Sequence, residues 1–198
     1  MEKPILFSAP MVRAILEGKK TQTRRVVKPT QSTPRVAPLR MEPWLIDGEQ
    51  ETDDHGLPCW AGYHPDYPGE AKWFSCPYGG VGDHLWVRET WNCIDTGRLT
   101  QRQDWVRYRA TDGEEMYWRP SIHMPRWASR LTLEITGVRV ERVQDITHDD
   151  AVAEGCYEVE GRSWGRLGFS QLWDSINAKR GYSWEANPWV WCVGFAVR

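Results

Sequence analysis

The sequence predicts an α+β protein, a small mixed β-barrel with helices packed against its ends and one long loop-rich insertion. Three observations carry this prediction: period-two alternation over 130–143, helical spacing of apolar residues over 8–17, and the same helical spacing over 169–176. Along the chain the order is helix, strands, two helices and a final strand. A chain of 198 residues can bury one substantial core, so we expect a single domain over 1–198.

The first helix is predicted over 8–17. Pro10 lies in its first turn, where no amide hydrogen is needed, and Gly18 ends it. A Gly-Asp turn later in the chain precedes a strand around 85–87, and a second strand is predicted over 105–110.

The remaining elements lie in the C-terminal half. Two strands bent at Gly137 are predicted within 130–143, because a glycine inside a strand often marks a bend. A short helix follows, with Thr147 as its N-cap, acidic residues in its first turn and Gly155 at its end. The apolar run 189–197 is predicted to be the last strand.

Residues 28–80 are predicted to form the loop-rich insertion. Prolines break every potential helix there, and the tryptophans at 44, 60 and 73 favour a partly ordered flap. The chain has 13 tryptophans, most of which we expect to pack in the core, while one or two stack on a base. The prolines of the insertion are Pro29, Pro34, Pro38, Pro43, Pro58, Pro65, Pro68 and Pro77.

Composition narrows the classes of protein. The net charge is −2, which does not suit a protein that coats duplex DNA, so any contact with nucleic acid has to be local. Five cysteines without close pairs argue against a disulfide framework and for a reducing compartment. No signal peptide or bilayer-spanning apolar stretch is predicted, so we expect a cytoplasmic protein with no membrane partner.

A cationic run directly follows the first predicted helix. Two lysines, two arginines and two threonines fall within 18–25, which makes this segment a candidate ligand site. Lys20 and Thr23 meet on one side of a turn, whereas an extended backbone aligns Thr23 with Arg25. A threonine hydroxyl becomes a nucleophile only when a base takes its proton, and a desolvated lysine can serve as that base.

The spacing Gly-x-Lys-x-x-Thr-x-Arg resembles the signature of the ASCH domain family, a branch of the PUA-like barrels, and is filled by Gly18, Lys20, Thr23 and Arg25. The resemblance implies a PUA-like fold over the whole chain, RNA binding and, in some members, hydrolysis. Four later segments resemble those of phage and prophage ASCH proteins: 76–79, 82–91, 121–130 and 187–191.

The resemblance also implies site residues. Compact ASCH enzymes that deacylate N4-acetylcytidine use a lysine and a threonine of this motif with a glutamate from the helix after the central strands. Carried over, these are Lys20, Thr23 and Glu154, with Arg25 binding the pyrimidine carbonyl or a phosphate. Residues 28–80 and a section around 92–118 have no counterpart in the compact enzymes, so the substrate can differ.

A second constellation follows the central strands. Glu89, Trp91, His123 and Arg126 are predicted to collect at one mouth of the barrel, where they would stack on and clamp a nucleotide. In the alternative, Glu89 pairs with an arginine, Trp91 fills the barrel and His123 is structural. A ribonuclease would use Lys20 with His123 or Arg126 around a scissile phosphate.

Two non-enzymatic classes stay open beside hydrolysis. One is a single-stranded RNA-binding module in which Lys20 and Arg25 hold phosphates only; the other is a protein-interaction scaffold. No metal and no cofactor are predicted, because the insertion lacks the close cysteine pair of a structural zinc site. Its potential ligands are His55, Cys59, His64 and Cys76.

Overall fold

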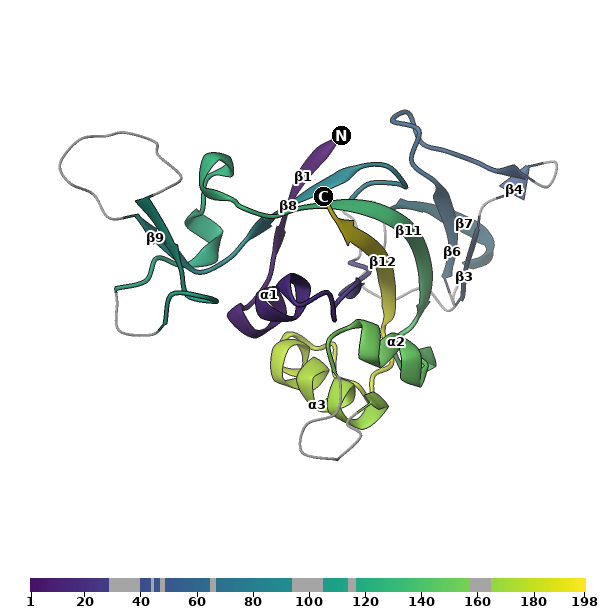
Figure 1. The fold of residues 1–198 in the computed structure, drawn as a ribbon. Coiled ribbons are helices and arrows are strands. Elements are labelled where there is room, and N and C mark those ends of the chain that lie inside the picture. Colours follow the sequence, from purple (N-terminus) through teal and green to yellow (C-terminus); the bar gives the residue numbers. More distant parts are fainter. Residues whose placement is uncertain are drawn as a thin grey trace.

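A five-stranded sheet forms the centre of an α+β fold. The computed structural model describes residues 1–28, 40–43, 45–46, 49–64, 67–93, 105–113, 117–156 and 165–198. The central sheet is curved, and helices lie against its concave side and one end (Figure 1). Its first pair is parallel and the other pairs are antiparallel. In spatial order the strands are β1 (Glu2–Leu6), β8 (His84–Arg88), β11 (Thr132–Arg142), β12 (Trp189–Val197) and β2 (Gln22–Val26).

The sheet is a mixed one, as predicted, but its two edge strands are not hydrogen-bonded to each other along their backbones in the described part of the chain. β1 and β2 therefore leave a seam in the curved sheet. The predicted strands around 85–87 and 189–197 are confirmed as β8 and β12. Alternate residues of these strands, among them Leu85 and Val193, are fully buried in the main core, because successive strand residues point to opposite faces.

α1 (Ala9–Leu16) confirms the first predicted helix. Ser8 precedes it in an extended conformation, and Pro10 lies in its first turn. Val12 and Ile15 pack into the main core. The helix is followed by Gly18, which has a φ of 68°, a left-handed conformation that glycine adopts without steric cost.

β11 corrects the prediction of two strands bent at Gly137. It is one continuous strand whose pairing with β12 shifts register between Ile135 and Gly137. A β-bulge of this kind bends a strand and increases its twist without ending the ladder. The glycine therefore marks a bulge in one long strand.

α2 (His148–Ala153) and α3 (Gly165–Asn177) confirm the two later helices. Thr147 caps α2 in a reciprocal capping box with Asp150, and α3 begins before the predicted position 169. Phe169 and Trp173 of α3 share a second buried cluster with residues of β12. No helix in the described ranges is long and apolar enough to cross a membrane. Two short 3-10 helices flank these elements, η4 (Val143–Asp145) and η5 (Ala178–Arg180).

The insertion is more regular than predicted. Its described part contains a three-stranded antiparallel sheet and a short hairpin, because proline excludes helix but is tolerated at strand ends and edges. Trp60 is buried and its ring meets that of Trp191 edge-on at 5.0 Å. Trp73 is 52% exposed, and Trp44 lies outside the described residues. The strands are β3 (Arg40–Pro43), β6 (Cys59–His64), β7 (Tyr67–Ser75), β4 (Leu45–Ile46) and β5 (Glu49–Gln50).

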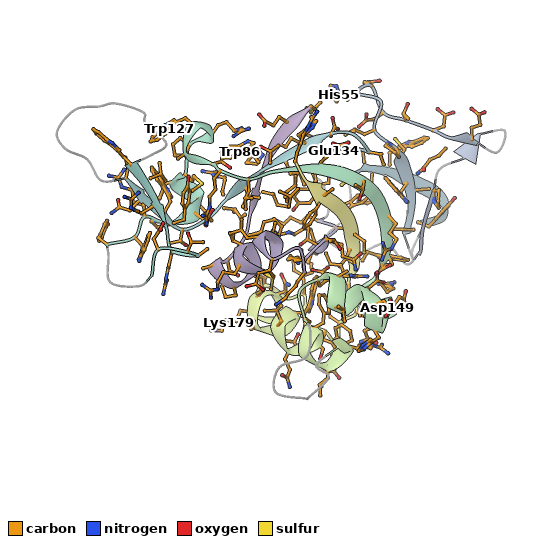
Figure 2. The ribbon with its side chains drawn as sticks, viewed as in Figure 1. His55, Trp86, Trp127, Glu134, Asp149 and Lys179 are labelled. Carbon is orange, nitrogen blue, oxygen red and sulfur yellow. The ribbon has the colours of Figure 1, made fainter. Side chains whose placement is uncertain are left out.

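A small arm projects from the opposite side of the central sheet (Figure 1). We define the arm as the described residues within 89–130. Its antiparallel pair is extended by a bridge between Trp91 and Arg119. The arm has a buried cluster of its own, against which Trp127 packs (Figure 2). The strand predicted over 105–110 is confirmed in a shorter form, and the elements are β9 (Trp91–Cys93), β10 (Val106–Tyr108), η2 (Ser121–His123) and η3 (Arg126–Ala128).

Candidate functional site

Lys20 lies in the interior, between the end of α1 and the start of β2. Its side chain is 2% exposed. The Nζ atom donates to the Gln22 carbonyl at 2.9 Å, to the Glu154 carbonyl at 2.8 Å and to Glu154 Oε2 at 2.8 Å. These contacts use all three N–H donors of an ammonium. Lys20 is therefore held as a charged ammonium, although burial lowers its pKa and the Glu154 charge opposes that shift.

Glu154 joins Lys20 to a larger ionic network. It is the residue that ends α2, and its second oxygen accepts from Arg24 Nη1 at 3.2 Å. Arg24 is wholly buried and also contacts Glu141 and, at 3.1 Å, Asp150. Arg139 adds contacts to the same two carboxylates at 3.0 and 2.9 Å. Three cations and three carboxylates thus neutralise one another in a network that runs from the buried Lys20 and Arg24 to Arg139, whose side chain is 47% exposed.

The network lowers the pKa of two of its carboxylates, Glu141 and Asp150. Burial acts to raise the pKa of Glu141. The charge and hydrogen bond of Arg24, together with hydrogen bonds from Cys192 and Arg139, act in the opposite direction, and the pKa lies below the ordinary value of 4.5. Burial also acts to raise the pKa of Asp150. A hydrogen bond from Gln22 and the charges of Arg24 and Arg139 together lower it far below the ordinary value of 3.8. The network is therefore a stable structural unit at neutral pH.

Sequence reasoning missed four members of this network: Arg24, Arg139, Glu141 and Asp150. Arg24 stood inside the cationic run and Asp150 among the acids of the first turn of the helix, so each was visible as a residue type. Their pairing was not, since more than a hundred residues of chain separate them.

Thr23 occupies the other face of β2. It is 4% exposed and stands opposite Val193 of β12. Alternation along the strand puts Thr23 and Arg25 on one face and Arg24 on the other. No hydrogen bond reaches the Thr23 hydroxyl from the described parts of the chain. Phe7 joins this face to the network, because the centre of its ring lies 5.7 Å from Lys20 Nζ and 5.2 Å from the Arg25 guanidinium.

Arg25 bridges the seam between the two edge strands. Its Nη2 donates to the Leu6 carbonyl of β1 at 2.6 Å, and its guanidinium lies 5.2 Å from the centre of the Phe7 ring. Its Nε is buried without a hydrogen-bond partner. Within the described ranges, no carboxylate pairs with Arg25. Burial lowers its pKa, opposed by Tyr78 and Glu154, but a guanidinium still stays charged at neutral pH.

The second predicted constellation is largely internal. Glu89 is 1% exposed and accepts from Arg130 at 2.9 and 3.1 Å, which matches the alternative in which it pairs with an arginine. Trp91 is 3% exposed and packs in the core of the arm, rather than in the barrel. Both side chains are therefore buried in positions where they support the arm, and neither lies at the protein surface where the predicted ligand contact would be made.

His123 and Arg126 are exposed on η2 and η3 of the arm. Arg126 donates to Glu2 of β1 at 2.7 Å. No contact among the described residues joins either side chain to Lys20, which lies between α1, β2 and α2. The set predicted for a ribonuclease is thus spread over two regions of the molecule.

Of the four residues considered as metal ligands, the structure describes the side chains of His55, Cys59 and Cys76. Within the described chain, no three or more histidine, cysteine, aspartate or glutamate side chains could hold a metal ion together. Cys59 and Cys76 are buried, and burial raises the pKa of the Cys76 thiol to about 11, which disfavours a thiolate ligand. His55 is exposed, and the side chain of His64 lies outside the described set.

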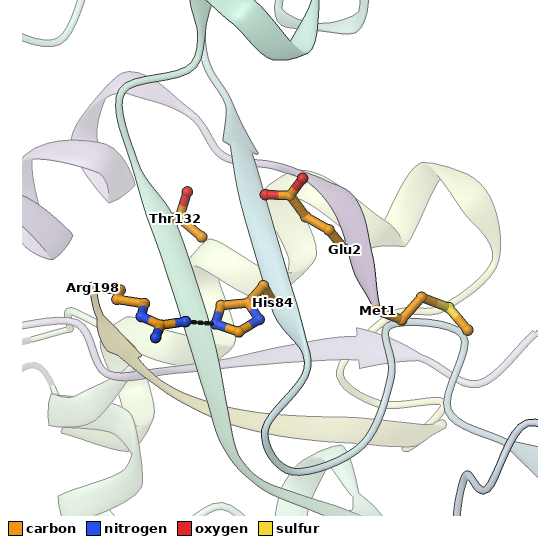
Figure 3. A pocket seen from close by; sticks show the side chains of 5 residues that line it. All are labelled: Met1, Glu2, His84, Thr132 and Arg198. Carbon is orange, nitrogen blue, oxygen red and sulfur yellow. Dashed lines mark hydrogen bonds between the residues drawn. The ribbon is translucent and has the colours of Figure 1, made fainter.

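An open pocket of about 480 Å³ lies on the outer face of the central sheet (Figure 3). Its lining contains none of the predicted site residues. The pocket is formed by Met1, Glu2, His84, Thr132 and Arg198.

Fold and site together define an α+β domain with a split, curved sheet and a buried Lys20–Glu154 pair behind its first helix. Among solved structures, the chain matches a high-resolution crystal structure of an ASCH domain from Lactobacillus crispatus JV V101, at 13% identity and a TM-score of 0.42. The match covers 99% of this chain and 79% of that chain. No protein-family model and no curated protein matches the chain. A TM-score at this level transfers neither a site nor an activity, so function has to be inferred from the chain's own residues.

Proposed function

We propose that the protein is an ASCH-type, PUA-like RNA-binding domain, whose nucleoside or single-stranded RNA ligand contacts Arg25 at the seam between β1 and β2. The observation that carries the proposal is the contrast among the three inner cations of the motif. Lys20 lies 2.8 Å from a Glu154 oxygen, and Arg24 lies within 3.2 Å of three carboxylates. Among the residues that the structure describes, Arg25 instead meets only a backbone carbonyl and an aromatic ring.

A guanidinium without a carboxylate is suited to an acceptor-rich ligand. A phosphate or a pyrimidine carbonyl can accept from the N–H groups that Arg25 does not use, and such charge-assisted hydrogen bonds are stronger than neutral ones. The Phe7 ring beside the guanidinium offers an apolar surface in the same place. In the described part of the chain, the seam also leaves backbone groups of the edge strands β1 and β2 without strand partners, and an incoming ligand can engage these groups.

The test compares Arg25→Met with Lys28→Met in binding to a labelled single-stranded RNA. Both substitutions remove one positive charge, and Lys28 is an exposed residue close to the end of β2. A hydrogen bond to a charged group contributes about 1.5–3 kcal/mol, so we expect R25M to bind roughly 10- to 100-fold more weakly and K28M to bind within about threefold of wild type. Equal binding by R25M and wild type would refute the role of Arg25.

Hydrolysis is the second candidate. It is favoured by the direct contact of Lys20 with Glu154 and by the position of Thr23 on β2, the strand that begins two residues after Lys20. We propose that Glu154 accepts the proton of a water, or of the Thr23 hydroxyl, as it attacks an acyl carbon. The Lys20 ammonium donates a proton to the leaving exocyclic nitrogen. Water and an N4-acylcytidine thus give a carboxylic acid and cytidine, by way of an acyl ester if Thr23 is the nucleophile.

N4-acetylcytidine tests this second candidate. Release of acetate and cytidine by wild type, with loss in Thr23→Val and Glu154→Gln, supports hydrolysis. Thr23→Val preserves the shape of the side chain, so an intact T23V protein as fast as wild type shows that the hydroxyl has no part in the reaction. If the protein binds RNA but forms no product, the non-catalytic RNA-binding module is the remaining candidate. Its affinity for RNA should then fall steeply as the salt concentration rises.

A further inference from the structure

The outer face of the central sheet carries aromatic and basic side chains in one row. His84, Trp86 and Arg88 of β8 are half-buried, and the two residues between them, Leu85 and Val87, are fully buried. Since successive strand residues point to opposite faces, the three half-buried side chains share the face that lies away from the core.

Neighbouring strands extend this face on both sides. β1 places Glu2, Pro4 and Leu6 opposite His84, Trp86 and Arg88, and all three of these β1 residues are exposed. β11 places Thr132 opposite Trp86 on the other side. The result is a shallow surface with an indole ring at its centre. It is bordered by η2, whose Ile122 carbonyl accepts a hydrogen bond from Arg88, and by η3, which carries Arg126.

Trp86 lies between two guanidiniums. The centre of its ring is 5.4 Å from Arg88 and 6.0 Å from Arg126. Arg126 reaches this position from η3. Its side chain is 45% exposed, and the side chain of its ion-pair partner Glu2 is 43% exposed. An ion pair this exposed contributes little to stability, so Arg126 can exchange Glu2 for a phosphate at small cost.

The row has a binding feature at each end. At the His84 end lies the open pocket, where Arg198 Nη1 is 2.5 Å from His84 Nε2 (Figure 3). At the Arg88 end, the facing residue is Leu6, whose carbonyl accepts from Arg25. The strand between the two ends spans about 13 Å at roughly 3.3 Å per residue. The surface thus connects the pocket with the seam.

The adjoining arm is short of hydrogen-bond acceptors. Three N–H groups in or beside it, on Arg88, Trp91 and Trp118, are buried without a partner. Residues 88–130 contain eight arginines and six carboxylates, a net charge of +2, while the whole chain has a net charge of −2. This segment is therefore more positive than the chain as a whole, and Arg88 and Arg126 bring part of its charge to the outer face, where they complement a polyanion.

We propose that this outer face, defined by His84, Trp86, Arg88, Arg126 and Arg198, is a track for single-stranded RNA. A base stacks on Trp86, the flanking phosphates contact Arg88 and Arg126, and the next nucleotide enters the pocket beside His84 and Arg198. Unpaired bases are free to stack in this way, whereas those of a duplex are not. The inference rests on the proposed RNA ligand and extends it from the Arg25 seam to a second surface.

The experiment uses the full chain with two probes, a fluorescein-labelled U12 oligonucleotide and uridine monophosphate. Trp86→Leu and Arg126→Met test the track. Trp73→Leu and Arg166→Met are the matched controls, because Trp73 is 52% exposed on β7 and Arg166 is an exposed arginine 5.5 Å from the Trp184 ring. Trp86→Tyr retains an aromatic face, and circular dichroism confirms that each variant is folded.

We expect W86L and R126M each to weaken U12 binding about five- to tenfold, and W86Y to restore most of the affinity. R126M should also reduce the slope of log K against log salt by roughly 0.7. Monophosphate binding, which depends on Arg25, should stay within twofold of wild type in all five variants.

Folded W86L and R126M proteins that bind U12 as tightly as the controls overturn the track. If R25M is the only variant that abolishes U12 binding, the Arg25 proposal stands and the track does not. If wild type binds monophosphate but not U12, the track is wrong and a nucleoside ligand remains, and if it binds neither probe, both proposals fail.

Discussion

Replacing Lys20 with methionine should destabilise the fold strongly. Methionine fills much of the same space but donates no hydrogen bond, so the carbonyls of Gln22 and Glu154 lose their donor. Glu154 would keep only the 3.2 Å contact to Arg24 while remaining 5% exposed. The variant therefore leaves a buried carboxylate poorly compensated.

The expected cost follows from that geometry. Removing one partner of a buried ion pair typically costs about 3–5 kcal/mol, and in a protein of this size each kcal/mol lowers Tm by roughly 2–4 °C. We therefore expect K20M to unfold about 6–20 °C below wild type. The double variant K20M/E154L should cost less than the sum of the two single changes, because it removes both charges together.

Urea denaturation of wild type, K20M, E154L and the double variant measures these free energies of unfolding. Lys28→Met is the matched control, and a change at this exposed site should stay within about 0.5 kcal/mol. A cost below about 1 kcal/mol for K20M, or strict additivity in the double variant, would show that Lys20 and Glu154 are not a buried pair.

Three further predictions concern stability. Wild type should lose stability as the pH falls below about 4.5, because Glu141 and Asp150 have folded-state pKa values below their ordinary values of 4.5 and 3.8. Asp150→Asn should be less stable than wild type at pH 7 and should lose less stability on acidification. Urea midpoints at pH 7, 4 and 3 measure both effects. Gly155→Ala should lower Tm, because Gly155 has a φ of 91° and a Cβ there would lie 3.3 Å from Ala14; an unchanged Tm would contradict the left-handed turn after α2. Arg130→Met should cost about 3–5 kcal/mol and strip the partner of buried Glu89, and a cost near zero would contradict that pairing.

Much of the fold could be predicted because local patterns carry it. The cap at Thr147, the stop at Gly155 and the alternation around Leu85 each act within a few residues, and the structure contains a helix or a strand at each of these places. The same locality misled the prediction for the insertion. Its prolines correctly excluded helix, but the pairing of β6 with β7 depends on cross-strand contacts that single residues do not reveal.

The candidate site was predictable only in part, for a similar reason. A resemblance brought Lys20 and Glu154 together across 134 positions, and their side chains are 2.8 Å apart. The partners of Arg24 come from β11 and α2, and no spacing along the chain links them. Burial was equally hidden, since a glutamate such as Glu89 has the composition of a surface residue until its fold is known.

The Nε–H group of Arg25 offers the most direct measurement of the central claim. It is buried without an acceptor in the free protein, so a bound phosphate or carbonyl should give it one. Side-chain ¹H–¹⁵N spectra, with the resonance assigned by its loss in R25M, can follow it during titration with uridine monophosphate and U12. We predict a large shift and slower hydrogen exchange at Arg25 on binding, with Arg24 little changed. Binding of the ligand with an unmoved Arg25 resonance would contradict the account.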